Sequence, residues 1–168
     1  MTGTSPTTAP ADSTQPEAAP TSSAPPTKSL ISRRFRGFLP IVVDFETGGF
    51  NCKTDALLEM AAVLLKMDDD GTLRRGETIH CPVKPFEGAN LEPAALQVTG
   101  IDPWHPLRFA ISERDALQHV FKPVREAMKE VDCNRAILVA HNAHFDLGFL
   151  NEAIARTGVK RSPFHPFS

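Results

Sequence analysis

Long apolar runs, paired cysteines and an excess of positive charge are all missing from this sequence of 168 residues. No apolar run approaches the roughly 20 residues needed to span a bilayer, so the sequence predicts no membrane segment. The three cysteines, Cys52, Cys81 and Cys133, are odd in number and far apart. This argues against a disulfide framework or a zinc site and indicates a reducing cytoplasm. With 18 Lys and Arg against 20 Asp and Glu, the net charge of −2 provides no global basic field for binding nucleic acid.

The N-terminal segment has few large apolar side chains. Among residues 1–29, 23 are Pro, Ser, Thr or Ala, and Met1 is the only large apolar residue. Such a composition cannot bury enough surface to offset the entropy of ordering. We therefore predict a disordered extension over residues 1–32 and a single domain over residues 33–168. No apolar run follows a basic start, so a signal peptide is not predicted.

The spacing of apolar residues after this extension predicts an α/β fold. Runs rich in β-branched and aromatic residues indicate strands, and an Asp-Gly turn between two apolar runs indicates a hairpin. Apolar residues at helical spacing after Ser112, a predicted N-cap, indicate a helix. A mixed sheet with helices packed on it is the natural assembly of this order. The predicted strands are 38–46, 56–66, 78–83 and 136–140, and the predicted helices are 92–97, 112–128 and 145–156.

Two carboxylates close the first predicted strand. Asp44 and Glu46 are two residues apart, so in a strand both side chains project from the same face. Like charges at close range raise each other's pKa unless a positive charge lies between them, and Mg²⁺ prefers carboxylate oxygens. The alternative interpretation is that both acids are simply solvated at the end of the strand. The apolar run before them and the Thr-Gly-Gly after them favour this alternative less.

A second polar group follows the predicted strand 136–140, at the position where open α/β sheets place their sites. The run HNAHFD contains His141, His144 and Asp146, and Asp146 falls in the first turn of the next helix. An acid there is also stabilised by the helix dipole alone. The H-x-x-H spacing does not put both imidazoles on one helical face, which disfavours zinc. Together with the two strand carboxylates, Asp146 would supply oxygen ligands for a pair of Mg²⁺ or Mn²⁺ ions that hydrolyse a phosphodiester.

These runs resemble motifs of a known family. Residues 44–47 (DFET) are similar to the first motif of the DEDD exonuclease superfamily, and residues 141–146 are similar to its second. Further blocks at 34–38, 86–90 and 160–167 resemble the ribonuclease T family, of the DEDDh type, within that superfamily. The resemblance implies an RNase H-like fold with two Mg²⁺ ions, which Mn²⁺ can replace. It also implies a homodimer that hydrolyses RNA such as tRNA precursors from a single-stranded 3′ end to 5′-mononucleotides.

The resemblance gives roles to aromatic and basic residues as well. Phe50, Phe145 and Phe167 match aromatic positions that stack on terminal bases. The alternative is an ordinary core residue, which is equally favoured for Phe145 but less favoured for Phe50, because Phe50 directly follows a Gly-Gly turn. Val98 stands where the family usually has Phe, and Ala94 stands where Glu is common, which bears on base selectivity at the 3′ end. Isolated basic residues are usually solvated surface charges, but five match a patch that serves the partner subunit's carboxylate site: Arg34, Arg36, Lys129, Arg135 and Lys160.

The family's third motif, with the His that acts as general base, and its fourth metal-binding Asp would lie beyond Ser168. We therefore expect a truncated chain without a general base or the C-terminal helices, and with weak or no activity alone. Other readings remain open. One is a DNA-preferring exonuclease of the proofreading type, which the blocks at 34–38 and 160–167 disfavour. A second is a non-catalytic RNA-binding module, and a third is an α/β protein whose acids are incidental.

Overall fold

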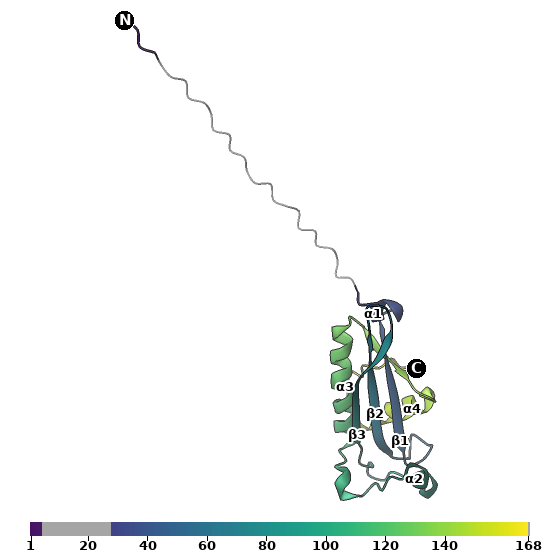
Figure 1. Ribbon diagram of the computed structural model, residues 1–168. Helices are drawn as coiled ribbons and strands as arrows, with labels where there is room; N and C mark the ends of the chain where they lie inside the picture. Colours follow the sequence, from purple (N-terminus) through teal and green to yellow (C-terminus); the bar gives the residue numbers. More distant parts are fainter. Residues whose placement is uncertain (5–27, 168) are drawn as a thin grey trace.

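The computed structural model describes residues 1–4 and 28–167, and the predicted disorder of residues 5–27 lies outside the described residues. Three strands, two helices, a strand and a helix follow the short first helix, in an order close to the predicted one (Figure 1). Within the described residues the elements are α1 (Leu30–Arg34), β1 (Phe38–Thr47), β2 (Leu57–Met67), β3 (Leu73–Pro82), α2 (Pro93–Thr99), the 3₁₀ turn η1 (Pro106–Arg108), α3 (Glu113–Glu130), β4 (Arg135–Val139) and α4 (Ala143–Thr157).

The strands form one mixed sheet in the order β3-β2-β1-β4. β1 is antiparallel to β2 and parallel to β4, and β2 is antiparallel to β3. In this register Glu46 lies opposite Glu59 on β2. β4 ends at Val139, opposite Val42, so it accompanies only the first half of β1. The predicted mixed α/β sheet is confirmed.

Alternation along β1 decides which face of the sheet carries the core. Leu39, Ile41 and Val43 are buried, whereas Val42 and Asp44 are exposed. The buried side chains of β1 share one apolar cluster with buried side chains of α3 and α4, so both helices contribute to the same core. The sheet therefore presents the side chains of its other face, including that of Asp44, to solvent.

Local signals that predicted the elements are visible as contacts. The Ser112 side chain accepts a hydrogen bond from the Asp115 N–H (3.1 Å) and caps α3. In the hairpin turn the Asp70 carboxylate accepts from the Thr72 N–H (2.8 Å), and Gly71 adopts a left-handed φ of 83°. The predicted hairpin and helix start are both confirmed.

Helical structure that packs on the domain begins before residue 33. Ser29 caps α1, and Ile31 is only 2% exposed within the core. The Ser32 hydroxyl donates to the Asp132 carbonyl (2.8 Å), which fastens this short helix to the segment before β4. Residues 30–32, placed by the sequence in the extension, therefore belong to a helix that packs on the domain.

Within the part of the chain that the structure describes, no helix is both long and apolar enough to cross a membrane. The three cysteines are free thiols, in agreement with the prediction against a disulfide framework. Burial raises the pKa of Cys81 to about 11, so this thiol is an inert core residue.

Candidate active site

The two strand carboxylates project from the solvent face of β1 near its end. Asp44 is exposed and Glu46 is partly buried, whereas Phe45 between them points into the core. This follows from the period of two along a strand, as the sequence predicted. The pair therefore stands together where β1 leaves the sheet.

Asp146 reaches the same place from α4. Because β4 ends opposite Val42, the later part of β1 has no strand partner on that side. The Asp146 Oδ1 accepts a hydrogen bond from the Phe45 N–H at 3.2 Å and so supplies a partner to this part of β1. The Asp146 residue is only 6% exposed, which makes it the most buried of the three acids. Asp44, Glu46 and Asp146 define what we call the carboxylate end of the sheet.

Electrostatics at the carboxylate end favour a positive ligand. The pKa of Glu46 is raised, chiefly by burial and further by the negative charges of Asp44 and Glu59. The pKa of Asp146 is also raised, chiefly by burial and further by Asp44, although the hydrogen bond from Phe45 acts in the opposite direction. The site therefore holds more negative charge than its surroundings compensate.

These acids fit a divalent cation in donor type and in charge. Carboxylate oxygens are the preferred ligands of Mg²⁺, and a cation would favour the charged carboxylates, which burial and the charge of Asp44 disfavour. Among residues 1–4 and 28–167, however, no group of three or more His, Cys, Asp and Glu is preassembled around a metal position. The three acids are thus suitable metal ligands by residue type, but their side chains are not arranged around a common metal position.

Three of the predicted aromatic residues gather around the first half of α4. Phe50 is 82% exposed, and its ring lies edge-on to that of Phe145, with centroids 6.2 Å apart. Phe167 is also exposed and lines a cavity of about 350 Å³ together with His144 and Gly148. Val98 is 87% exposed on α2. Phe145 itself is half-buried and packs on the core through Phe149, as expected of a core residue, and its predicted contact with a base stays a prediction.

A buried acid fixes the loop that carries Phe50. Asp55 is 1% exposed and accepts hydrogen bonds from the Asn51 N–H (2.9 Å), the Thr54 hydroxyl (2.7 Å) and the Asn90 amide (3.0 Å). Burial alone would raise its pKa, but these hydrogen bonds hold the pKa below the ordinary value. A Cβ at Gly49 would collide with the Asp55 carboxylate, so glycine is required for the chain to pass this close.

Four of the five predicted basic residues lie at the opposite end of the sheet. Arg135 is the register partner of Phe38 at the start of β1, and Arg36 lies just before that start. Phe38 and Glu46 are separated along the strand by roughly 26 Å. The Arg135 guanidinium also donates to the Ser162 carbonyl (3.2 Å), which brings the segment after α4 to this place. We call this region the basic end, and its members are Arg34, Arg36, Lys129 and Arg135, whereas Lys160 lines a separate cavity with Arg114 and Lys122 of α3.

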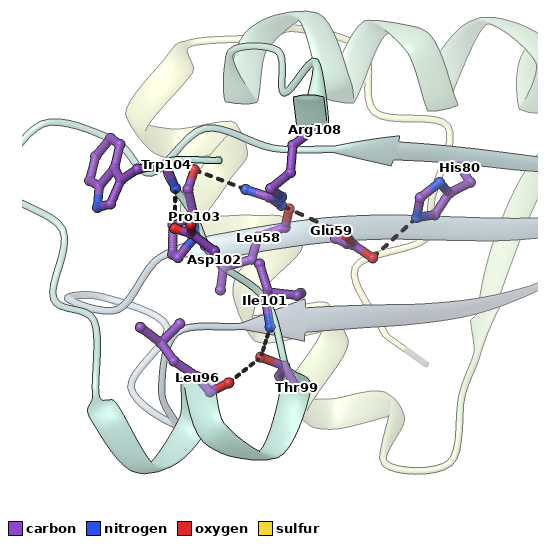
Figure 2. Close-up of polar contacts among 10 residues, drawn as sticks. All are labelled: Leu58, Glu59, His80, Leu96, Thr99, Ile101, Asp102, Pro103, Trp104 and Arg108. Atoms are coloured by element: carbon purple, nitrogen blue, oxygen red, sulfur yellow. Dashed lines mark hydrogen bonds and ion pairs between the residues drawn. The ribbon is translucent and has the colours of Figure 1, made fainter. Parts of the chain in front are cut away.

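The sequence did not identify three polar residues beside the carboxylates. Glu59 faces Glu46 across the β1–β2 register, and its carboxylate lies 3.2 Å from the His80 Nε2 and 3.7 Å from the Arg108 guanidinium (Figure 2). The one available signal was a single acid within the otherwise apolar strand from 57 to 65. Its partners come from β3 and from η1, and no local pattern predicts that meeting.

Comparison with known proteins places the chain among nucleases. A family model described as Exonuclease matches residues 41–167. The chain is 61% identical over 140 residues to ribonuclease T of Photorhabdus laumondii, a match covering 83% of this chain and 64% of that protein. It is 62% identical over 138 residues to ribonuclease T of Marinobacter nauticus, covering 82% of this chain and 62% of that protein. The chain thus spans a little under two thirds of the length of these relatives.

Solved structures of exonuclease I from E. coli share the fold. In complex with a dT13 oligonucleotide, that enzyme gives a TM-score of 0.57 at 18% identity, covering 77% of this chain and 25% of that one. The complex with dA16 gives 0.56 at 19% identity, covering 71% and 24%. At this level of identity the likeness concerns architecture alone, and it confirms the predicted RNase H-like α/β fold.

Proposed function

The chain belongs to the exonuclease family, and on that basis we propose that it acts as a 3′→5′ exoribonuclease of the ribonuclease T type. Such an enzyme removes nucleotides from an RNA 3′ end and releases 5′-mononucleotides. The observation that carries the proposal is the identity of 61–62% with ribonuclease T proteins. The family match over residues 41–167 also contains all three acids of the carboxylate end.

The exonuclease family implies divalent metal ions, and we assign their binding to Asp44, Glu46 and Asp146. We propose two Mg²⁺ ions, which Mn²⁺ can replace. When bound, such ions activate a water molecule and stabilise the leaving oxygen of the phosphodiester. The chain itself supplies negative charge and orientation, because the hydrogen bond from the Phe45 N–H holds the Asp146 carboxylate at the end of β1.

Substrate bases would contact the aromatic residues beside α4. The rings of Phe50 and Phe167 are exposed, and the Phe145 ring packs edge-on against that of Phe50. Stacking on such rings suits unpaired bases and contributes about 1–3 kcal/mol per base. Val98 would contribute less, since a valine has no π-face. We therefore propose RNA with a single-stranded 3′ end as the substrate, tRNA precursors in the cytoplasm among them.

The position of the basic end supports a homodimer. Carboxylates repel phosphate, so RNA must be attracted by cations from elsewhere. Within one chain the basic end lies roughly 26 Å from the carboxylates. We propose that the basic end of one subunit serves the carboxylate end of its partner.

Within the described residues, no histidine hydrogen bonds to Asp44, Glu46 or Asp146. A carboxylate site of this family needs a base to deprotonate the attacking water. We therefore expect the polypeptide 1–168 to bind divalent cations and RNA, and to trim RNA slowly.

The proposal is tested by incubating the chain with 5′-labelled single-stranded RNA and Mg²⁺, with DNA of the same sequence as competitor. We expect one-nucleotide shortening from the 3′ end, abolished by chelation and by Asp44→Ala, and stronger competition by RNA than by DNA. Asp69→Ala, an exposed acid in the β2–β3 turn, is the matched control and should change nothing. Calorimetry with Mn²⁺ supplies a second readout that needs no turnover. Mn²⁺ binding that Asp44→Ala leaves intact, or metal-independent cleavage, would overturn the proposal.

A further inference from the structure

The segment that follows α2 contains several large apolar side chains that are exposed to solvent. Trp104 and Leu107 are each 70% exposed and Phe109 is 78% exposed, only a few residues after the exposed Val98. No other stretch of this length in the described chain holds as many exposed large apolar side chains. Exposed apolar surface gathered in this way marks a site of interaction.

The loop over residues 101–109 is fastened to the sheet rather than left free. The Arg108 side chain is only 11% exposed, and its guanidinium donates to the Leu58 carbonyl (2.8 Å) and to the Pro103 carbonyl (3.1 Å). Just beyond the loop, the Ile111 N–H donates to the Pro82 carbonyl (3.0 Å). The loop is thus tied to β2 by Arg108 and to the end of β3 by its backbone.

This fastening links the loop that carries Trp104 to the carboxylate end through Arg108. Arg108 also lies 3.7 Å from the Glu59 carboxylate, and Glu59 is the direct register partner of Glu46. Figure 2 shows the Trp104 ring on the far side of this contact, pointing away from Arg108 and the strands. The indole is therefore carried by a loop that is anchored to a neighbour of the site, and its ring remains open to a ligand.

We propose that Trp104 is a base-stacking residue that binds an unpaired nucleobase of RNA upstream of the 3′ end. This rests on the proposed function, since the phosphate chain must pass the carboxylates for a neighbouring base to meet the ring. The Arg108 cation offsets the negative charge of Glu59. The surface along the loop over residues 101–109 therefore repels the phosphates of RNA less than the carboxylate end does. An indole face accepts any base, which suits a single strand, whereas a paired base in a duplex keeps its faces stacked on its neighbours.

The intrinsic fluorescence of the chain can be used to detect this contact, because the chain contains one Trp and no Tyr. Titration of the wild-type chain with a short single-stranded oligoadenylate should change Trp104 emission in parallel with the anisotropy of a labelled copy of the same RNA. A blunt RNA duplex of the same strand should leave the emission unchanged. By anisotropy, Trp104→Leu should weaken single-strand binding about tenfold, whereas Trp104→Phe should retain most of it.

Leu73→Ala, which removes an exposed apolar side chain in the β2–β3 hairpin, is the matched control and should bind normally. Unchanged Trp104 emission while anisotropy reports bound RNA would overturn the inference, as would wild-type affinity in Trp104→Leu. Emission that follows protein concentration instead of RNA would assign the surface to contact between copies and would also overturn it. If the chain trims RNA but Trp104 emission does not change, the stacking role of Trp104 is refuted and the proposed function is not. If Trp104 emission changes but no metal-dependent trimming occurs, the proposed function is refuted and the stacking role is not.

Discussion

The carboxylate end and the basic end belong to one sheet but differ in charge. At the carboxylate end, burial and the charge of Asp44 raise the pKa of Glu46 and of Asp146. At the basic end, Arg36 and Arg135 lie at the starts of β1 and β4. The net charge of −2 is a sum over the whole chain, so it shows neither the acidic nor the basic region. A balanced composition therefore does not show where in the fold charges of each sign gather.

The two ends also differ in what holds them together. Near the carboxylate end, Arg156 pairs with Glu113 through bonds of 2.7 and 3.1 Å, and the Glu113 side chain is 5% exposed. The same guanidinium lies over the Phe86 ring at 4.1 Å and donates to the Cys52 carbonyl (3.2 Å). The basic end instead uses separate hydrogen bonds from side chains to carbonyls, such as that of Arg135. One end thus includes a buried ion pair, whereas among the described residues the basic end shows only separate hydrogen bonds of this kind.

The largest effect should come from breaking the ion pair. Arg156→Ala should lower the free energy of unfolding by about 3–5 kcal/mol, because Glu113 would be left charged and buried. Arg135→Ala at the basic end should cost no more than about 1 kcal/mol. Urea denaturation measures both. Adding Glu113→Gln to Arg156→Ala should recover part of the loss, and equal losses for the two arginines would remove the contrast between the ends.

Gly49→Ala should come next, with a loss of about 1–3 kcal/mol, since the new Cβ must displace Asp55 from its buried hydrogen bonds. Gly148→Ala is the matched control at the same end. Its Cβ would meet only the Cys52 side chain at 3.5 Å, and alanine favours the helix by up to about 1 kcal/mol. Thermal melts of both variants give the comparison. A harmless Gly49→Ala would show that the loop carrying Phe50 is not fixed by Asp55.

A smaller effect of opposite sign is expected from Asp146→Asn. The folded-state pKa of Asp146 lies above its ordinary value of 3.8, so the folded protein binds more protons between the two values. The charged form therefore destabilises the fold at neutral pH, and this penalty disappears as the pH falls below 3.8. Asn can still accept from the Phe45 N–H.

Without divalent cations, Asp146→Asn should therefore raise the stability by about 1 kcal/mol at neutral pH, and the gain should vanish in acid. Mn²⁺ should stabilise the wild type and leave the variant unchanged. Melting temperatures across a pH series, with and without Mn²⁺, measure both effects. A variant that is less stable at every pH would show that the charge of Asp146 supports the fold.

The smallest effect concerns the salt dependence of RNA binding. Each cation that contacts phosphate in a single strand adds about 0.7 to the slope of log affinity against log salt. Arg36→Gln and Arg135→Gln should each reduce the slope by about that amount. Arg74→Gln should not, because Asp68 already pairs with that guanidinium at 2.7 Å. Equal slopes for all three variants would remove the basic end from RNA binding.

Local pattern was sufficient for most of the fold. The apolar alternation before Asp44, the Asp-Gly turn at Gly71 and the cap at Ser112 each act within a few residues, so the strands, the hairpin and α3 follow from the sequence. The helix α1 did not, because a helix of 5 residues has little stability of its own and forms only where Ser32 and Ile31 dock.

The same division holds for the carboxylate end. The sequence by itself determined that Asp44 and Glu46 share a face, because strand periodicity is local. Only the tertiary structure decided that β4 stops early enough for Asp146 to reach the Phe45 N–H. The pairing register likewise placed Glu59 opposite Glu46, and the packing of η1 brought Arg108 to it. These contacts join segments far apart in the chain, and their positions depend on where strands pair and end, which no short stretch of sequence encodes.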